Sequence, residues 1–555
     1  MTLISCLGMA KQALAVNEAA ITAVSNNISN VDTPGYSKLR VNLASVVIKS
    51  SSSTANNVIT GVNSLSGVEV SSISRYSNTY LQSSYWGANS DSSYMNEYSN
   101  IASNIESLTN ELQDSGLSTA LSNFYSSIDA LAAAPNDATA RGNYLTAAQN
   151  VCTMFNSTGA SLSDIKESLV GNGDSTDGSE LSSSVDQVNG LLDQLANINS
   201  SIIKTGGATN SASSSGLLDQ RDSLVTQLSS LMNVNVTQNA NGTVGISLGN
   251  DALVSSSSVV GYLNAANSVD ISGNTVTTMN IVDKKGTTIY PDVNDSITSG
   301  SIGAILDSCG TNSDNLTISN VTKGLDTLAQ SFANALNIVQ RDDPDGDGSV
   351  PMCITTDGTN TLSPASELIA VNKNSITTTT TTSTTGQTTT TISSSSAGIT
   401  AADIAINPNV VAFPNKIAAA RLSASEYQDW LATGEHSQDT GNNKNATILQ
   451  TLRTAKLTQA YDSDYNITDL GNNTIDGYLA NIVGNVGTKT ENINTSLTTQ
   501  TSVVASIKSQ LSSETGVNLD EELTDLIKYQ RAYEASARIF STCSSILQEL
   551  VMLGK

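Results

Sequence analysis

The chain has 555 residues, with 25 Lys or Arg against 50 Asp or Glu, so its net charge is −25. A chain this acidic is disfavoured as a ligand of nucleic acid or of an anionic membrane surface. Its one histidine, His436, argues against histidine-based catalysis and against histidine-rich metal sites.

The first predicted element is a helix that begins at the N-terminus. Apolar residues recur there at alternating spacings of four and three, broken only by the polar Asn17, as in the seam of a coiled coil. The segment has no basic stretch followed by an apolar core, so we predict no secretory signal peptide. The seam residues predicted to pack between subunits are Leu3, Leu7, Leu14, Ile21, Val24 and Ile28.

An asparagine-rich segment follows this helix and reads NNISNVDTPGYS over residues 26–37. Its Thr33-Pro34-Gly35-Tyr36 is typical of a type II turn, because Pro suits the second position and Gly suits the third, where φ must be positive. Taken alone, the segment indicates a helix stop and a turn. The residues singled out here are Asn26, Asn27, Asn30, Pro34, Gly35 and Tyr36.

The middle of the chain changes from a helical to an alternating pattern. Residues 76–231 carry helical stripes, with a helix break at Pro135. From Val234 the apolar residues alternate, and Asn241-Gly242 predicts the turn of a β-hairpin. We therefore expect helices first and strands after them, with the strand-like pattern continuing to Tyr290.

A helix predicted over residues 325–339 leads into an acidic segment. Asp343, Asp345 and Asp347 occupy positions 1, 3 and 5 of a calcium-binding loop, but Ile354 stands where the twelfth position needs Glu. We interpret this segment as an acidic turn, with a weak calcium site as the alternative.

A threonine-rich tract follows at residues 377–396. Its runs of Thr predict either an exposed β-rich insertion or a solvated linker. After the tract, helical character is predicted to return at Ile417.

A second seam helix is predicted at the C-terminus. Gly516 ends an upstream stripe over residues 493–511, and Asn518 can cap the new helix, with Glu521 placed as in a capping box. Acidic residues in the first turn suit the helix dipole. The seam residues predicted to pack between subunits are Leu519, Leu523, Leu526, Tyr533, Ala537, Phe540, Leu547 and Val551.

The two seams have two possible interpretations. Each could be an ordinary core helix, or the two helices could pair with each other and with copies in neighbouring chains. Chain ends usually fray unless something holds them. We favour the second interpretation because both seams lie at the extreme ends of the chain.

The order of elements predicts an α+β multidomain fold, with a helical stalk built from both chain termini and β-rich domains inserted in the middle. The predicted domains are 1–47 plus 505–555 (terminal coiled-coil-like helices, an inner tube domain), 48–230 plus 300–342 plus 415–504 (mainly helical stalk), 231–299 (β-rich outer domain) and 343–414 (Thr/Ser-rich insertion, a small β domain or exposed loop).

The sequence also predicts that several kinds of site and segment are absent. The widely spaced cysteines show no zinc-binding pattern, and we predict each to be a small buried apolar residue rather than half of a disulfide. No apolar run is long enough for a membrane span. No catalytic or cofactor-binding motif is present, so we predict neither an enzyme nor a cofactor.

Segments at both ends resemble a known family. The helix that ends in NNISNVDTPGYS is similar to the N-terminal signature of the flagellar axial proteins, which comprise rod, hook and hook-associated proteins. Residues 529–538, YQRAYEASAR, resemble the matching C-terminal signature. Three more segments resemble the hook-associated members, namely LLDQRD at 217–222, GVNLDEE at 516–522, and AAPND at 133–137 with Arg141 downstream.

The resemblance implies a structural subunit of the bacterial flagellum at the hook–filament junction, assembled as a tubular zone through its terminal helices. The implied partners are the hook protein below, hook-associated protein 3 above and an export chaperone on the C-terminal helix, with neither nucleic acid nor membrane. The implied location is extracellular, in the flagellum, reached through the flagellar type III secretion system without a cleaved signal peptide.

Two alternatives stay open. The hook protein shares both terminal signatures, although the 217–222 segment and the long helical region before it argue against it. A secreted adhesin or surface enzyme would explain the Thr/Ser-rich insertions. The terminal seams and the lack of a catalytic constellation argue against that class.

Overall fold

The structure is a computed structural model that describes residues 3–48, 64–114, 116–173, 175–206, 212–269, 275–310, 315–341, 347–357, 359–382, 388–456, 470 and 472–553. The chain divides into two compact units. Unit 1 contains residues 1–97, 172–304 and 496–555, and unit 2 contains residues 98–171 and 305–495. Both units are therefore assembled from segments that lie far apart in the sequence.

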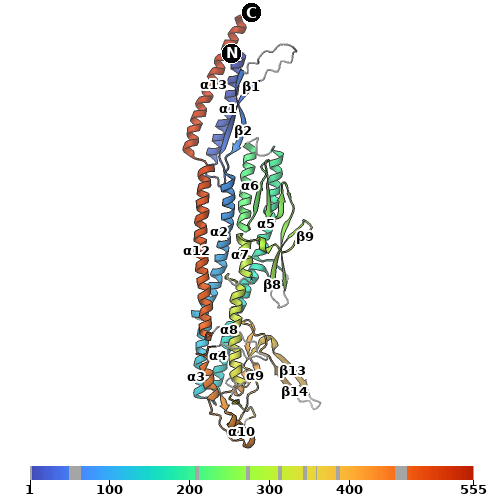
Figure 1. Ribbon diagram of the computed structural model, residues 1–555, viewed down its shortest axis with the longest axis vertical. Coiled ribbons are helices and arrows are strands. Elements are labelled where there is room, and N and C mark those ends of the chain that lie inside the picture. The colour runs from blue at the N-terminus through green and yellow to red at the C-terminus, as the bar shows by residue number, and fades with distance from the viewer. Residues whose placement is uncertain are drawn as a thin grey trace. The chain divides into compact units, whose positions relative to one another are not determined.

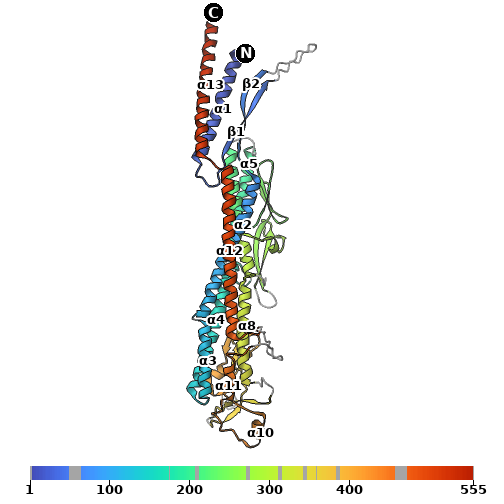
Figure 2. The same cartoon turned by 60° about the vertical axis from the view of Figure 1, so that its left-hand side comes forward.

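In unit 1 the two ends of the chain form a helix pair. Helix α1 (Leu3–Ser29) and helix α13 (Leu519–Leu553) lie side by side and run in opposite directions (Figures 1 and 2). Strands β1 (Leu39–Ile48) and β2 (Ser64–Arg75) form an antiparallel hairpin that packs on α1. Both predicted seam helices are confirmed, whereas the β1–β2 hairpin was not predicted.

The rest of unit 1 places a helix pair against two small sheets. Helices α5 (Glu180–Lys204) and α6 (Ala212–Leu231) pack together, and α5 contacts both sheets. The sheets have the strand orders β3-β4-β5-β6 and β7-β8-β9. Their strands are β3 (Asn235–Gln238), β4 (Val244–Leu248), β5 (Asp251–Ser255), β6 (Ser258–Val259), β7 (Tyr262–Val269), β8 (Thr275–Val282) and β9 (Thr288–Tyr290), with a 3₁₀ turn at Asn294–Ser296.

Asparagine side chains join α5 to the strand edges. The Asn199 amide donates to the carbonyls of Val244 (2.8 Å) and Ser256 (2.5 Å), and its oxygen accepts from the Val244 amide (3.1 Å). Asn189 makes the same reciprocal pair with Leu263. Each side chain therefore pairs with the strand backbone as a neighbouring strand would, which satisfies buried backbone groups.

The predicted hairpin turn at Asn241-Gly242 is confirmed. Gly242 has a φ of 86°, and its amide donates to the Asn239 carbonyl over 2.9 Å. Positive φ is the conformation that glycine adopts at low cost, which explains why this pair closes β3 onto β4.

Unit 2 is centred on helices α3 (Leu117–Ala133), α4 (Ala138–Val170) and α8 (Ile318–Arg341). The predicted break at Pro135 lies between α3 and α4, where the Asp137 side chain caps α4 by accepting from the Thr139 amide. Four aromatic rings from these helices form the core contacts, namely Phe124, Tyr144, Phe155 and Phe332. Long helices α2 (Thr79–Asp114) and α12 (Ile475–Thr515) and the shorter α7 (Gly300–Cys309) contribute residues to both units.

The β segments of unit 2 are short. Strand β16 (Ala420–Leu422) pairs with β10 (Val350–Ile354), so the predicted return of helix at Ile417 is wrong for these residues. The physical reason is tertiary, because Ala420 and Leu422 are buried against β10. The remaining elements are β11 (Leu362–Pro364), β12 (Ala370–Asn372), β15 (Ile404–Ile406), α9 (Pro408–Ala412), α10 (Ala424–Thr433), α11 (Lys444–Thr451) and 3₁₀ turns at Lys373–Ser375 and Pro414–Lys416.

The threonine-rich tract contains a β-hairpin. Strand β13 (Thr377–Thr382) pairs antiparallel with β14 (Thr388–Ser393) in an unbroken register from Thr377–Ser393 to Thr382–Thr388. Of the two sequence interpretations, the structure agrees with the β-rich insertion. Threonine favours this outcome because its branched side chain packs well on a pleated surface.

The predicted α+β fold is confirmed, since long helices from both termini enclose a middle that contains every described strand except the β1–β2 hairpin. Within the described parts of the chain, none of the helices combines the length and the apolar character that crossing a bilayer requires.

Candidate functional site

The candidate site is the paired termini, and Asn27 is its most connected residue. Asn27 is 1% exposed. Its oxygen accepts from the Leu39 amide (2.8 Å) and the Tyr36 hydroxyl (2.9 Å), and its amide donates to the Leu39 carbonyl (3.1 Å) and to Glu522 Oε2 (3.0 Å). One side chain thus connects the end of α1, the start of β1 and the first turn of α13.

The predicted type II turn is confirmed. Gly35 has a φ of 79°, and the Tyr36 amide donates to the Thr33 carbonyl over 3.2 Å. Asn30 closes the helix before the turn, because its side chain donates to the Asn26 carbonyl and accepts from the Thr33 hydroxyl. The turn therefore places the Tyr36 hydroxyl within hydrogen-bonding distance of Asn27. Pro34 lies within the turn and Asn26 is exposed on the helix before it.

Tyr36 lies between two acidic groups of unit 1. Burial, together with the carboxylates of Asp219 and Glu522, raises the pKa of Tyr36 to about 12, so its hydroxyl stays a hydrogen-bond donor. The pKa of Glu522 is raised by its own burial, against the opposing hydrogen bond from Asn27. The turn, α6 and α13 therefore meet in one partly buried polar junction.

The predicted seam of α1 is only partly buried in the single chain. Val24 is buried, while Leu7, Leu14, Ile21 and Ile28 are half-buried, and the side chain of Leu3 lies outside the described part. The face of α1 that is fully buried consists mainly of smaller residues, namely Ala10, Val16, Ala20, Ala23 and Val24, together with Asn27. The heptad stripe includes Ala10 and Val24 of this face but misses the rest of it, which the recurrence of Ala at positions 10, 13, 20 and 23 could have indicated.

The predicted seam of α13 leaves several large apolar side chains in solvent. Leu526, Ala537, Phe540 and Leu547 are half-buried, whereas Leu519, Leu523, Tyr533 and Val551 are exposed. Five further exposed apolar residues lie outside the predicted heptad stripe, namely Ile527, Ile539, Ile546, Leu550 and Met552. We call the exposed set Leu519, Leu523, Ile527, Tyr533, Ile539, Ile546, Leu550, Val551 and Met552 the α13 apolar surface.

A buried ion cluster lies in the LLDQRD segment of α6. Arg75, at the end of β2, donates to Asp219 Oδ1 over 2.7 Å and also to Asp222. Arg221 donates to Asp222 Oδ1 over 2.6 Å and to the Gly242 carbonyl. The cluster thereby ties β2, α6 and the β3–β4 turn together. Its two guanidinium groups balance its two carboxylates.

Burial and the neighbouring opposite charges shift the pKa values of Asp219 and Arg75 in opposite directions. Burial raises the pKa of Asp219 to about 6, despite the nearby Arg75 guanidinium and a hydrogen bond from the Ser37 backbone. The pKa of Arg75 is raised by Asp222 and Asp219, although burial opposes that shift. The raised pKa means that the folded unit favours neutral Asp219, so losing the charge of Asp219 should cost less stability than losing that of Asp222, which contacts both guanidinium groups.

A matched pair of variants tests this ranking. Asp222→Asn should lower the free energy of unfolding by about 3–5 kcal/mol, because it leaves two buried guanidinium groups short of a carboxylate. Asp219→Asn should cost less, since Arg75 keeps Asp222. Because the folded pKa of Asp219 exceeds its unfolded value, wild-type stability relative to Asp219→Asn should fall as pH rises from 4 to 6. Urea unfolding of the wild type and both variants at pH 4, 5, 6 and 7 measures these free energies. Equal losses of stability in the two variants at every pH would contradict the ranking.

The predicted acidic calcium segment is only partly described. Asp343 and Asp345 lie outside the described residues, so the weak calcium site stays a prediction, and Asp347 accepts from the Ser349 amide. Across the described ranges, no three His, Cys, Asp or Glu side chains gather as a metal ion would require. His436 is paired with Asp439.

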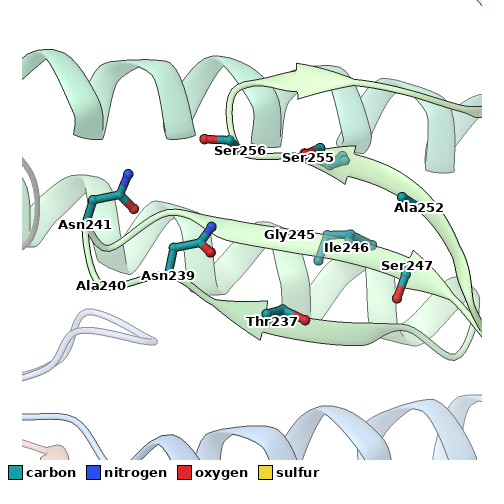
Figure 3. A pocket seen from close by; sticks show the side chains of 11 residues that line it. Thr237, Asn239, Ala240, Asn241, Gly245, Ile246, Ser247, Ala252, Ser255 and Ser256 are labelled. Atoms are coloured by element: carbon teal, nitrogen blue, oxygen red, sulfur yellow. The ribbon is translucent and has the colours of Figure 1, made fainter.

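A shallow hollow of about 670 Å³ lies over strands β3–β5 (Figure 3). Asn, Ser, Thr and small apolar residues line it, and none of those lining residues is acidic, basic or a thiol. Asn239 and Asn241 are already hydrogen-bonded to Thr243, so they hold the hairpin turn. The hydroxyl groups in the hollow therefore have no carboxylate, imidazole or amine among its lining residues to activate them as nucleophiles.

Comparison with known proteins agrees with the terminal signatures. Residues 102–352 match the family described as "Flagellar hook-associated protein FlgK helical domain", residues 7–36 match "Flagella basal body rod protein", and residues 509–553 match "Flagellar basal body rod FlgEFG protein C-terminal". Flagellar hook-associated protein 1 of Bacillus subtilis (strain 168) is 25% identical over 573 residues, covering 98% of this chain and 97% of the relative. The chain is therefore similar over nearly its whole length to a flagellar hook-associated protein.

Further relatives show the same similarity. Flagellar hook-associated protein 1 of Salmonella typhimurium is 27% identical over 582 residues, covering 99% of both chains, and that of Escherichia coli (strain K12) is 25% identical over 580 residues, covering 99% of both. The flagellar hook junction protein FlgK from Burkholderia pseudomallei has a similar fold, with a TM-score of 0.52 and 16% identity over 78% of this chain and 100% of that one. The chain is thus a structural component of the flagellum.

Proposed function

We propose that this chain forms the hook–filament junction, where its subunits assemble into a short tube through α1 and α13. The α13 apolar surface carries the proposal. Exposed aliphatic side chains on one helix cost free energy in water and gain about 25 cal/mol per Å² when a neighbour covers them. Such a surface is unfavourable on a monomer in water, whereas in an assembly the neighbouring subunits bury it.

The assembly geometry follows from the kind of contact. A contact between two different faces of the same subunit repeats around an axis and produces a ring or helix rather than a closed dimer. The half-buried seam residues of α1 and the exposed seam of α13 lie on one helix pair and supply two such faces. We propose that residues 1–47 with 505–555 are the inner tube domain and that the remaining predicted domains lie outside it.

The proposed neighbours follow the names of the relatives, which are hook-associated and hook junction proteins. We propose the hook protein below this chain and hook-associated protein 3 above it. Export through the flagellar type III secretion system, with a chaperone on α13, would keep the apolar surface covered before assembly.

Immunogold labelling of purified hook–filament complexes tests the proposal. Antibodies against residues 231–299 should place gold at the boundary between hook and filament, and a deletion strain should keep hooks but lose attached filaments. Gold along the entire hook would instead support the hook-protein alternative. Gold spread over the cell surface would support the adhesin alternative.

A further inference from the structure

Two cysteines face each other across the terminal helix pair. The Sγ atoms of Cys6 in α1 and Cys543 in α13 are 2.6 Å apart, although 537 positions separate them in the chain. Both are free thiols, Cys6 half-buried and Cys543 buried. Their spacing in the sequence shows no such relation, so only the pairing of α1 with α13 brings them together.

The register of the helix pair supports this contact independently. Asn27 bonds Glu522 near the other end of the pair. Cys6 lies 21 residues before Asn27, and Cys543 lies 21 residues after Glu522, which is three heptads in each helix. Two contacts at opposite ends therefore fit one antiparallel register, in which small inner residues such as Ala20 and Ser536 allow the helices to approach closely.

We propose that Cys6 and Cys543 form an intramolecular disulfide that covalently joins the first turns of α1 to the last turns of α13. The bond would hold the two seams in a single register while leaving the α13 apolar surface free. It would also close almost the whole chain into one loop, the kind of cross-link that restricts an unfolded chain most.

A low-molecular-weight disulfide can supply the oxidation by exchange. The thiolate of Cys6, the more accessible of the two, attacks one sulfur of that disulfide, forms a mixed disulfide and releases one small thiolate. The Cys543 thiolate then attacks the Cys6 sulfur and releases the second small thiolate. Two protein thiols become one disulfide, the small disulfide is reduced to two thiols, and the two protons pass to the released thiolates.

The other three cysteines provide internal controls. Burial raises the pKa of Cys152 and that of Cys309 to about 12, which keeps both as protonated, poorly reactive thiols at neutral pH. Cys353 is buried against Ser363 and Pro364. The hydrogen bond with Cys6 raises the pKa of Cys543 as well, but its sulfur already contacts that of Cys6, so oxidation should be selective for the terminal pair.

The site of oxidation in the cell rests on the proposed function. A reducing cytoplasm would keep both thiols free, and the bond would form only after export. The chemistry itself depends on the helix pair alone, so a purified chain tests it separately from any flagellar role.

Peptide mapping of the purified full-length chain is the test. The chain is incubated with glutathione disulfide, remaining thiols are blocked with N-ethylmaleimide, and trypsin then cuts after Lys11 and Arg538. We expect residues 1–11 and 539–555 as one linked species, two hydrogens lighter than the sum of the two peptides and separable by dithiothreitol. Cys6→Ser and Cys543→Ser should lose this species, while Cys353→Ser should keep it.

Chain mixing separates a bond within one chain from a bond between two. An equal mixture of ¹⁵N-labelled and unlabelled protein should yield only fully labelled and fully unlabelled linked peptides. Hybrid peptides would overturn the proposal, as would recovery of Cys6 and Cys543 as separate glutathione adducts or as blocked thiols.

Hydrogen exchange gives a second readout that does not depend on the serine variants. Backbone amides in the first turns of α1 should exchange at least about tenfold more slowly in the oxidised chain than in the reduced chain. Unchanged exchange in a chain shown to carry the linked peptide would contradict the inferred role in holding the register.

Discussion

Leu523→Asp is expected to abolish swimming while leaving the isolated chain folded. Leu523 is 46% exposed in the single chain, so its replacement should change the free energy of unfolding by less than about 0.5 kcal/mol. In the proposed tube the same position is covered by a neighbour. There the substitution loses about 1.5–3 kcal/mol of apolar burial in every subunit and adds the cost of an unpaired carboxylate.

Ile289→Asp provides the matched control. Ile289 is 40% exposed and lies on β9, away from the terminal helices in the fold of unit 1. Ile289→Asp removes an equally large aliphatic side chain, so a strain that carries this variant should swim normally. Motility in soft agar and electron microscopy of hooks and filaments measure the outcome. Normal swimming by Leu523→Asp, or equal defects in both variants, would count against assembly through α13.

Asn27→Ala should weaken the terminal helix pair by roughly 2–4 kcal/mol. The substitution leaves the Leu39 amide, the Tyr36 hydroxyl and the Glu522 carboxylate without the partner that each has in the wild type. Buried groups that lose a partner cost about 1–3 kcal/mol each, offset in part by water entry. Hydrogen exchange of the backbone amides in α1 and α13 measures the loss. In the control variant Asn26→Ala, at the exposed neighbouring position, these amides should exchange at the wild-type rate.

Asn27→Asp adds a pH dependence with a definite sign. The new carboxylate can still accept from Leu39 and Tyr36, but it faces Glu522, whose pKa is already raised by burial. A folded pKa above the unfolded value means that the folded state binds more protons, so stability rises as pH falls. Asn27→Asp should therefore be weakest at pH 7 and recover toward pH 4. A variant that is no weaker at pH 7 than at pH 4 would contradict the Asn27–Glu522 contact.

Local patterns in the sequence predicted much of the backbone. The seam helices, the break at Pro135, the turn at Gly35 and the hairpin turn at Gly242 all depend on residues within a few positions of one another. Positive φ, capping and helical periodicity act at that range. The β1–β2 hairpin and β16 were missed because their strands are defined by partners rather than by their own pattern.

The candidate site was predicted as a set of residues but not as an arrangement. The motif residues Asn27 and Tyr36 do meet, yet their contact with Glu522 crosses 495 positions of the chain and follows no local rule. The predicted seam residues with described side chains range from buried to exposed in the single chain, and their packing between subunits stays a prediction. Which of them face the partner helix and which face solvent could not be read from the heptads, since the inner face of α1 consists mainly of alanine and other small residues.

Local sequence patterns were enough to predict a long helix with an apolar seam at each chain end and an asparagine-rich turn after the first helix. The structure confirms the predicted pairing of α1 with α13, and the contact of Cys6 with Cys543 emerges only from that packing. It also decided that the α13 apolar surface stays exposed. The physical reason is that periodicity specifies an apolar stripe, whereas the choice of its partner depends on packing between segments at opposite ends of the chain.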